Sequence, residues 1–147
     1  MGNLEKRYSS IISKEENDLV DAVELELIRM VESGEFKTAE FPLRHIFTEG
    51  LYAREITMYA ESRLTSKIHL TDHQFIVSKG RVLVYNGGEE IEIVAPYHGI
   101  TKAGTRRVLY VLEDTIWTTF HANPNNETVE QIENRILEKY QNKLLNK

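Results

Sequence analysis

The chain has 147 residues, of which 41% are hydrophobic and 28% charged, and its formal net charge is -5 at pH 7. This composition is typical of one globular domain, and the acidic balance argues against general affinity for nucleic acid. The sequence contains no cysteine, which excludes disulfides and thiolate metal ligands. No apolar run approaches the roughly 20 residues of a membrane span. We therefore expect a soluble protein without membrane or nucleic-acid partners.

The first predicted element is an amphipathic helix over residues 14–33. Its apolar residues recur at helical spacing, Ser13 and Glu16 form a candidate capping box, and Gly34 is a natural helix stop. We expect this helix to pack on the rest of the domain or on another subunit. The segment 35–50 predicts a connector, with His45 in a loop.

From Leu51 onward the pattern changes to short segments rich in Val, Ile, Tyr and Thr, which are typical of β-strands. Asn86-Gly87-Gly88 predicts a tight hairpin, and Glu113-Asp114 predicts another turn. His98 falls in a predicted loop. Closely spaced strands of this kind indicate a sandwich or a small barrel. The predicted strands cover residues 52–58, 75–77, 81–85, 89–94, 107–112 and 116–120.

The tail predicts a second amphipathic helix. Thr128 and Gln131 form a candidate capping box, and an apolar stripe continues through Ile136, Tyr140 and Leu144. The predicted organisation is one compact domain, with an N-terminal helix and connector over 1–49, a barrel over 50–122 and a C-terminal helix over 123–147.

The segment 61–80 resembles the first conserved motif of the cupin superfamily in its spacing. Glu61 stands at the first Gly of that motif and Lys67 at its first His. His69 matches the second His, His73 replaces the Glu, and Gly80 matches the closing Gly. The resemblance implies a mainly β fold, a cupin-like jelly-roll β-barrel flanked by N- and C-terminal amphipathic α-helices.

The second cupin motif fits residues 96–111, where Gly104 keeps the turn glycine and Arg107 takes the His position. Longer phrases, such as residues 50–56, 99–110 and 117–121, are similar to small cupin-like proteins of tailed bacteriophages and prophages. This likeness implies a place in the cytoplasm of a bacterial host or in a virion. The lack of a signal-peptide core and of a long apolar run predicts no secretion and no transmembrane segment.

Side chains on one strand alternate sides, so Lys67 and His69 share a face, which in a cupin points into the barrel. Three functions follow for that face. In the first, His69, His73 and His121 bind a divalent metal such as Fe, Mn, Ni or Zn, as in cupin dioxygenases or isomerases. Against this, Lys67 and Arg107 stand at former ligand positions and repel a cation.

In the second, Lys67 and Arg107 bind an anion or a small metabolite, because Arg offers a planar fork for carboxylate or phosphate and Lys a point charge. In the third, the mouth residues pair with carboxylates such as Glu55, Glu61 or Glu113. The barrel is then a structural or assembly component, a homo-oligomer or a partner of other phage structural proteins. The sequence favours this third function slightly and leaves the other two open.

Overall fold

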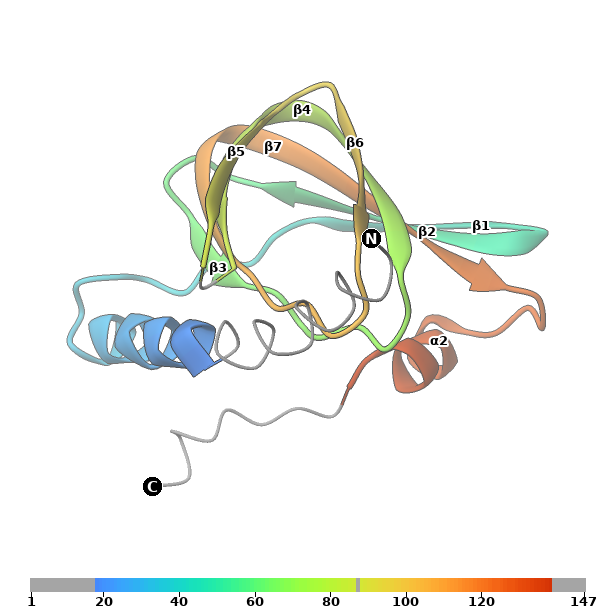
Figure 1. Cartoon of the computed structure of the whole chain (residues 1–147), viewed down its shortest axis with the longest axis horizontal. Helices are drawn as coiled ribbons and strands as arrows, with labels where there is room; N and C mark the ends of the chain where they lie inside the picture. Colours follow the sequence, from blue (N-terminus) through green and yellow to red (C-terminus); the bar gives the residue numbers. More distant parts are fainter. Residues whose placement is uncertain (1–17, 87, 139–147) are drawn as a thin grey trace.

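The computed structural model describes residues 18–86 and 88–138 (Figure 1). This part of the chain contains a helix over residues 18–32, seven strands and a short helix near its end. The strands are β1 (Leu43–Thr48), β2 (Gly50–Met58), β3 (Arg63–Thr65), β4 (His73–Tyr85), β5 (Glu90–Val94), β6 (Tyr97–Thr101) and β7 (Val108–Asn123), and the short helix is α2 (Val129–Ile136).

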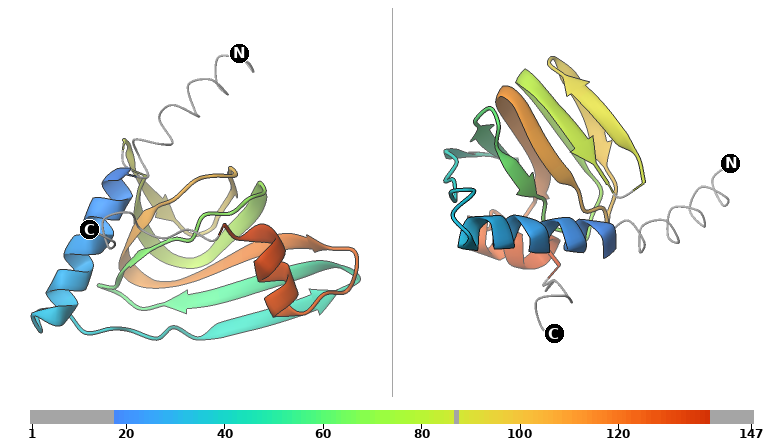
Figure 2. Two further views of the ribbon diagram at one scale, coloured as in Figure 1. Left: turned by 90° about the horizontal axis from the view of Figure 1, so that it is seen from below. Right: turned by 90° about the vertical axis from the view of Figure 1, so that its left-hand side faces the viewer.

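Two long strands, β4 and β7, hold the barrel together. The pairing order is β1-β2-β7-β4-β5, with β3 also on β7 and β6 also on β4. The first half of β4 pairs with β6 and its second half with β5, while β7 pairs first with β3 and later with β2. Each long strand therefore pairs with different strands along its two halves and bends between the two halves (Figures 1 and 2). The predicted mainly β jelly-roll barrel with flanking helices is confirmed.

The bend lies where Gly80 of β4 approaches β7. Gly80 has a φ of +98°, and a Cβ at this position would collide with the Thr115 hydroxyl and the Asp114 carbonyl. The register between β4 and β7 shifts here, at Val77/Lys79 and again on both sides of Arg81. The turn expected at Glu113-Asp114 is wrong, because both residues lie inside the continuous strand β7. Irregular pairing next to a glycine curves this strand, where the sequence pattern suggested a break.

Three short strands, β1, β3 and β6, were not predicted. His45 lies on β1 and His98 on β6, so the loops expected for both residues are wrong. Strand β1 is at the edge of the sheet order, and nearly all its side chains are exposed. Such a strand has no alternation of apolar and polar residues that a sequence reading can detect. The hairpin expected at Asn86 does join β4 to β5, and the Asn86 side chain accepts hydrogen bonds from the backbone N–H groups of Gly88 and Glu89, at 3.2 and 2.9 Å.

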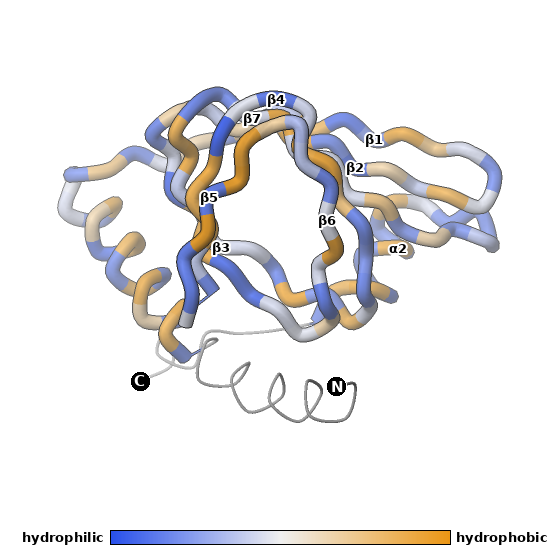
Figure 3. Tube along the Cα trace, turned by 45° about the horizontal axis from the view of Figure 1, so that its top comes forward, coloured by the Kyte–Doolittle hydropathy of each residue, from blue (hydrophilic) through white to orange (hydrophobic). Residues whose placement is uncertain are grey.

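The barrel core consists of buried side chains from alternate strand positions. Figure 3 shows hydrophobic and hydrophilic residues interleaved along the barrel strands. It is formed by Met58, Phe75, Val77, Val82, Val84, Ile93, Leu109, Val111 and Trp117. A second buried cluster lies where α2 packs on β2, with Ile132 and Ile136 against Tyr52.

The helix over residues 18–32 is fixed to the barrel by a buried ion pair. Arg106 contacts Asp21 and Glu24, and Glu24 also accepts a hydrogen bond from Thr65 at 2.6 Å. The expected packing of this helix on the body is confirmed for the described residues, and Gly34 follows its end with a φ of +85°. Residues 14–17 of the predicted helix and its capping box at Ser13 and Glu16 lie outside the described part.

The capping box of α2 is confirmed, since Thr128 and Gln131 exchange hydrogen bonds of 2.9 and 3.3 Å. The helix ends earlier than expected, at Ile136. Leu137 has extended backbone and forms a β-bridge with His69 instead. Pairing with the barrel therefore takes the place of the next helical turn, and Tyr140 and Leu144 lie outside the described residues. Within residues 18–86 and 88–138, no helix is long and apolar enough to cross a membrane.

Candidate functional site

The barrel encloses a cavity of about 210 Å³. Two paired strands supply much of its wall, since Tyr52 of β2 lies opposite His121 of β7 and Arg54 opposite Thr119. These positions alternate along each strand, so their side chains point to the same side. The end of β3, the segment 66–69 that follows it and helix α2 line the remaining sides, with Leu137 held against His69 by the β-bridge.

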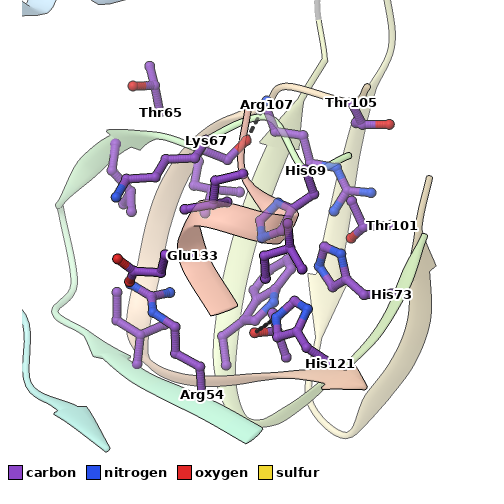
Figure 4. A pocket seen from close by; sticks show the side chains of 18 of the residues that line it. Arg54, Thr65, Lys67, His69, His73, Thr101, Thr105, Arg107, His121 and Glu133 are labelled. Carbon is purple, nitrogen blue, oxygen red and sulfur yellow. Dashed lines mark hydrogen bonds between the residues drawn. The ribbon is translucent and has the colours of Figure 1, made fainter. Parts of the chain in front are cut away.

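All five residues predicted for a site line this cavity, namely Lys67, His69, His73, Arg107 and His121 (Figure 4). Lys67 and His69 both line the cavity, but the strand expected to carry them is absent, since residues 66–68 lie outside any strand. Ile68 between them is buried elsewhere, at 4% exposure. The carboxylates expected to pair with Lys67 and Arg107 do not do so in the described part of the chain. Glu55 pairs with Arg44 instead, at 3.9 Å.

The three histidines form one contiguous cluster. The ring centroids of His69 and His73 are 4.3 Å apart, those of His73 and His121 4.9 Å, and those of His69 and His121 5.5 Å with the rings nearly parallel. Burial lowers the pKa of His69 to about 4 and that of His121 to about 3, and neighbouring charged groups add to both shifts. Burial also lowers the pKa of His73, with a further contribution from Arg107. The imidazoles are therefore neutral at pH 7.

The Nδ1 atoms of His73 and His121 are buried and have no hydrogen-bond partner among the described residues. Neutral imidazoles with free nitrogens are the donors that Zn or Fe prefers. The three imidazoles are not arranged as metal ligands, however. Within residues 18–86 and 88–138, no group of three His, Cys, Asp or Glu side chains is arranged to hold a metal ion. The donor chemistry suits a metal, but the side chains as they stand do not form a site for one.

The most unusual charged group of the cavity is Arg107. Its guanidinium lies over the Phe75 ring, 5.6 Å from the centroid, and Phe75 in turn stacks on Trp117 at 4.6 Å. Burial lowers the pKa of Arg107 from its ordinary value. No carboxylate of the described residues forms an ion pair with it. A guanidinium keeps its charge even when partly desolvated, so Arg107 presents an uncompensated cation to the cavity.

Sequence reasoning missed two further charged residues of the cavity, Arg54 and Glu133 (Figure 4). Arg54 was detectable, because it alternates with Tyr52 and Ile56 on a predicted strand. Glu133 was not, because nothing in its local sequence indicates that α2 lies against the barrel. Among the described residues, Arg54, Lys67 and Arg107 face a single lining carboxylate, which leaves an excess of positive charge on a protein that is acidic as a whole.

The backbone supports the motif register seen in the sequence. Glu61, at the first glycine position of the cupin motif, has a φ of +71°, a conformation that glycine adopts more readily. Gly80 and Gly104, at the closing and turn positions, have φ values of +98° and +82°. All three of these positions therefore have a left-handed backbone conformation.

No protein-family model and no curated protein matches the chain. Among solved structures, a cupin-2 domain containing protein from Shewanella frigidimarina is similar to it with a TM-score of 0.48 and 14% identity, covering 63% of this chain and 89% of that one. KdgF from Halomonas sp. has a TM-score of 0.49 and 14% identity over 59% of this chain and 83% of its own. A cupin superfamily protein from Desulfitobacterium hafniense has a TM-score of 0.46 and 6% identity over 61% of this chain and 85% of its own.

Likeness at these TM-scores carries no information about activity. The class is defined by the strand order, the bend at Gly80 and the positive φ values at the motif positions. The protein is a cupin-like jelly-roll barrel with a cavity lined by Lys67, His69, His73 and Arg107, among other residues.

Proposed function

We propose that the protein binds a small organic anion in the barrel cavity, with Arg107 as its principal partner. The proposal rests on one observation, a partly buried guanidinium that faces the cavity and has no carboxylate partner among the described residues. Burying a cation without a counter-ion costs free energy, and a bound carboxylate or phosphate removes that cost. An Arg fork binds such a group through two parallel hydrogen bonds.

The other walls of the cavity are suited to the same kind of ligand. Thr101 and Thr105 offer hydroxyl groups, while Ile56, Leu109 and Trp117 offer apolar surface. The volume of about 210 Å³ lies below the roughly 300–1,000 Å³ of most ligand pockets, so it suits a small metabolite rather than a nucleotide or a peptide. The neutral histidines add hydrogen-bonding groups without adding a second strong charge.

Thermal denaturation tests this function. We expect citrate or phosphate, compared with sodium chloride at equal ionic strength, to raise the melting temperature of the wild type. The Arg107→Gln variant should show no such rise. The control Arg44→Gln removes an Arg that is 70% exposed and outside the cavity, so it should respond as the wild type does. An equal rise in wild type and Arg107→Gln contradicts the proposal.

Metal binding by His69, His73 and His121 is the second candidate. It is favoured by the two unpartnered Nδ1 atoms in a cluster of neutral imidazoles, but it requires the rings to rotate into a common site. A bound metal would supply Lewis-acid or redox chemistry to a ligand held by Arg107. Metal analysis of protein purified without a histidine tag decides this, since equal metal in wild type and in His69→Ala/His73→Ala argues against the site.

A role in assembly, as a homo-oligomer or with phage structural proteins in a bacterial host or virion, is a separate proposal. Its support is the apolar side chains on one face of the edge strand β1, where Leu43 and Phe47 are 47% and 45% exposed. Sedimentation at high concentration tests self-assembly, and a strict monomer counts against it. Neither outcome bears on anion binding, because these side chains do not line the cavity.

A further inference from the structure

The cations of the cavity fall into two groups. Figure 4 shows the Arg107 guanidinium on one side, with Thr101, Thr105 and His73, and the Arg54 and Lys67 side chains on the other, with Glu133 between them. Their electrostatic influence divides in the same way. Arg107 acts on His73, whereas Arg54 acts on His69 and His121. The cavity therefore has two cationic ends.

Both ends carry net positive charge. Arg107 stands alone at its end, without an ion-pair partner among the described residues. At the other end, Arg54 and Lys67 outweigh the single carboxylate of Glu133. A ligand with one negative charge would compensate one end and leave the other uncompensated. A ligand with two separate charges would compensate both.

Much of the cavity lining is apolar. Ile56, Leu109, Trp117 and Leu137 contribute to it. Such a wall suits methylene groups better than hydroxyl groups, because a buried hydroxyl without a hydrogen-bond partner costs free energy. The volume of about 210 Å³ limits the connecting chain to a few carbons.

We propose that the anion is a short dicarboxylate, with one carboxylate on Arg107 and the other at the end formed by Arg54 and Lys67, where two cations outnumber the carboxylate of Glu133. This inference rests on the proposed anion-binding function and narrows its ligand class. A single phosphate also carries two charges, but it places them on one centre and reaches only one end of the cavity. The two-ended arrangement therefore selects two carboxylates on a short apolar chain.

Calorimetric titration with matched ligands tests the inference. Glutarate and butyrate have similar apolar chains and differ in the second carboxylate, and inorganic phosphate serves as the single-centre anion. At constant ionic strength, we expect glutarate to bind the wild type at least tenfold more tightly than butyrate or phosphate. Arg54→Gln should reduce glutarate affinity to the level of butyrate and leave butyrate unchanged. Arg107→Gln should abolish the binding of both.

The outcomes separate the two proposals. Equal affinity for glutarate and butyrate, or tighter binding of phosphate, with each dependent on Arg107, overturns the dicarboxylate inference and leaves anion binding intact. No binding of any of the three ligands overturns both. Lys67→Gln provides a second variant at the same end, at an exposed position where the fold tolerates the change, so a folding defect in Arg54→Gln does not remove the test. Unchanged glutarate affinity in Lys67→Gln and in folded Arg54→Gln also overturns the inference.

Discussion

The buried ion pair between the N-terminal helix and the barrel gives the sharpest prediction about stability. The Arg106 and Asp21 side chains are 5% and 3% exposed, and Glu24, the second carboxylate on Arg106, is 23% exposed. Replacing Arg106 by Met keeps the length and apolar volume of the side chain but removes its charge. The Asp21 carboxylate then stays buried without the Arg106 cation. Breaking a buried pair in this way typically costs about 3–5 kcal/mol.

Urea denaturation followed by circular dichroism measures this cost. For a domain of this size, the loss corresponds to a fall of about 10–15 °C in melting temperature. The matched control is Arg29→Met, which breaks an exposed pair with Glu26 whose side chains are 66% and 59% exposed, and which should cost no more than about 0.5 kcal/mol. A second replacement, Asp21→Leu, should recover most of the loss in Arg106→Met, because it removes the buried charge. A cost below about 1 kcal/mol for Arg106→Met would refute the reasoning.

Three further predictions concern the fold and the histidine cluster. Unfolded histidines titrate near 6.5 while folded His69 and His121 titrate at about 4 and 3, so the unfolded state binds more protons as the pH falls below about 6.5. The free energy of unfolding should therefore fall between pH 7 and 5, by up to about 1.4 kcal/mol per pH unit for each histidine. A His69→Gln/His121→Gln variant whose free energy of unfolding falls as steeply as that of the wild type would contradict this. Gly80→Ala should cost at least about 2 kcal/mol in chemical denaturation, because φ is +98° and the Cβ has no room, and a neutral effect would argue against the bend. Thr128→Ala should cost about 1 kcal/mol through loss of the capping box, and Thr128→Ser should restore most of it.

The sequence contains enough information to predict the fold class and the face that bears the site. Motif spacing over residues 61–80 places Lys67, His69 and His73 correctly around one cavity, although only two residues of that stretch are identical to the motif. Glu61 and Gly80, at the two ends of that stretch, both have positive φ values, +71° and +98°.

The parts that were not predictable depend on contacts between distant segments. The sequence of β7 predicts two strands with a turn at Glu113-Asp114, whereas the structure has one bent strand. The bend is set by Gly80, more than 30 residues earlier in the chain, so it cannot be predicted from the local sequence. Helix α2 stops at Ile136 although its apolar pattern continues, because Leu137 pairs with His69. Glu133 enters the cavity wall only as a result of that docking.

The claim that Arg107 binds the anion is tested most directly by an NMR signal from the Arg107 side chain itself. In a nitrogen-15 correlation spectrum of arginine Nε–H groups, the Arg107 peak is identified by its loss in Arg107→Gln. On titration with glutarate, we predict a saturable shift of this peak with the same midpoint as the calorimetric titration, while the Arg44 peak stays in place. An Arg107 peak that does not move while glutarate binds would place the ligand outside the cavity and contradict the account.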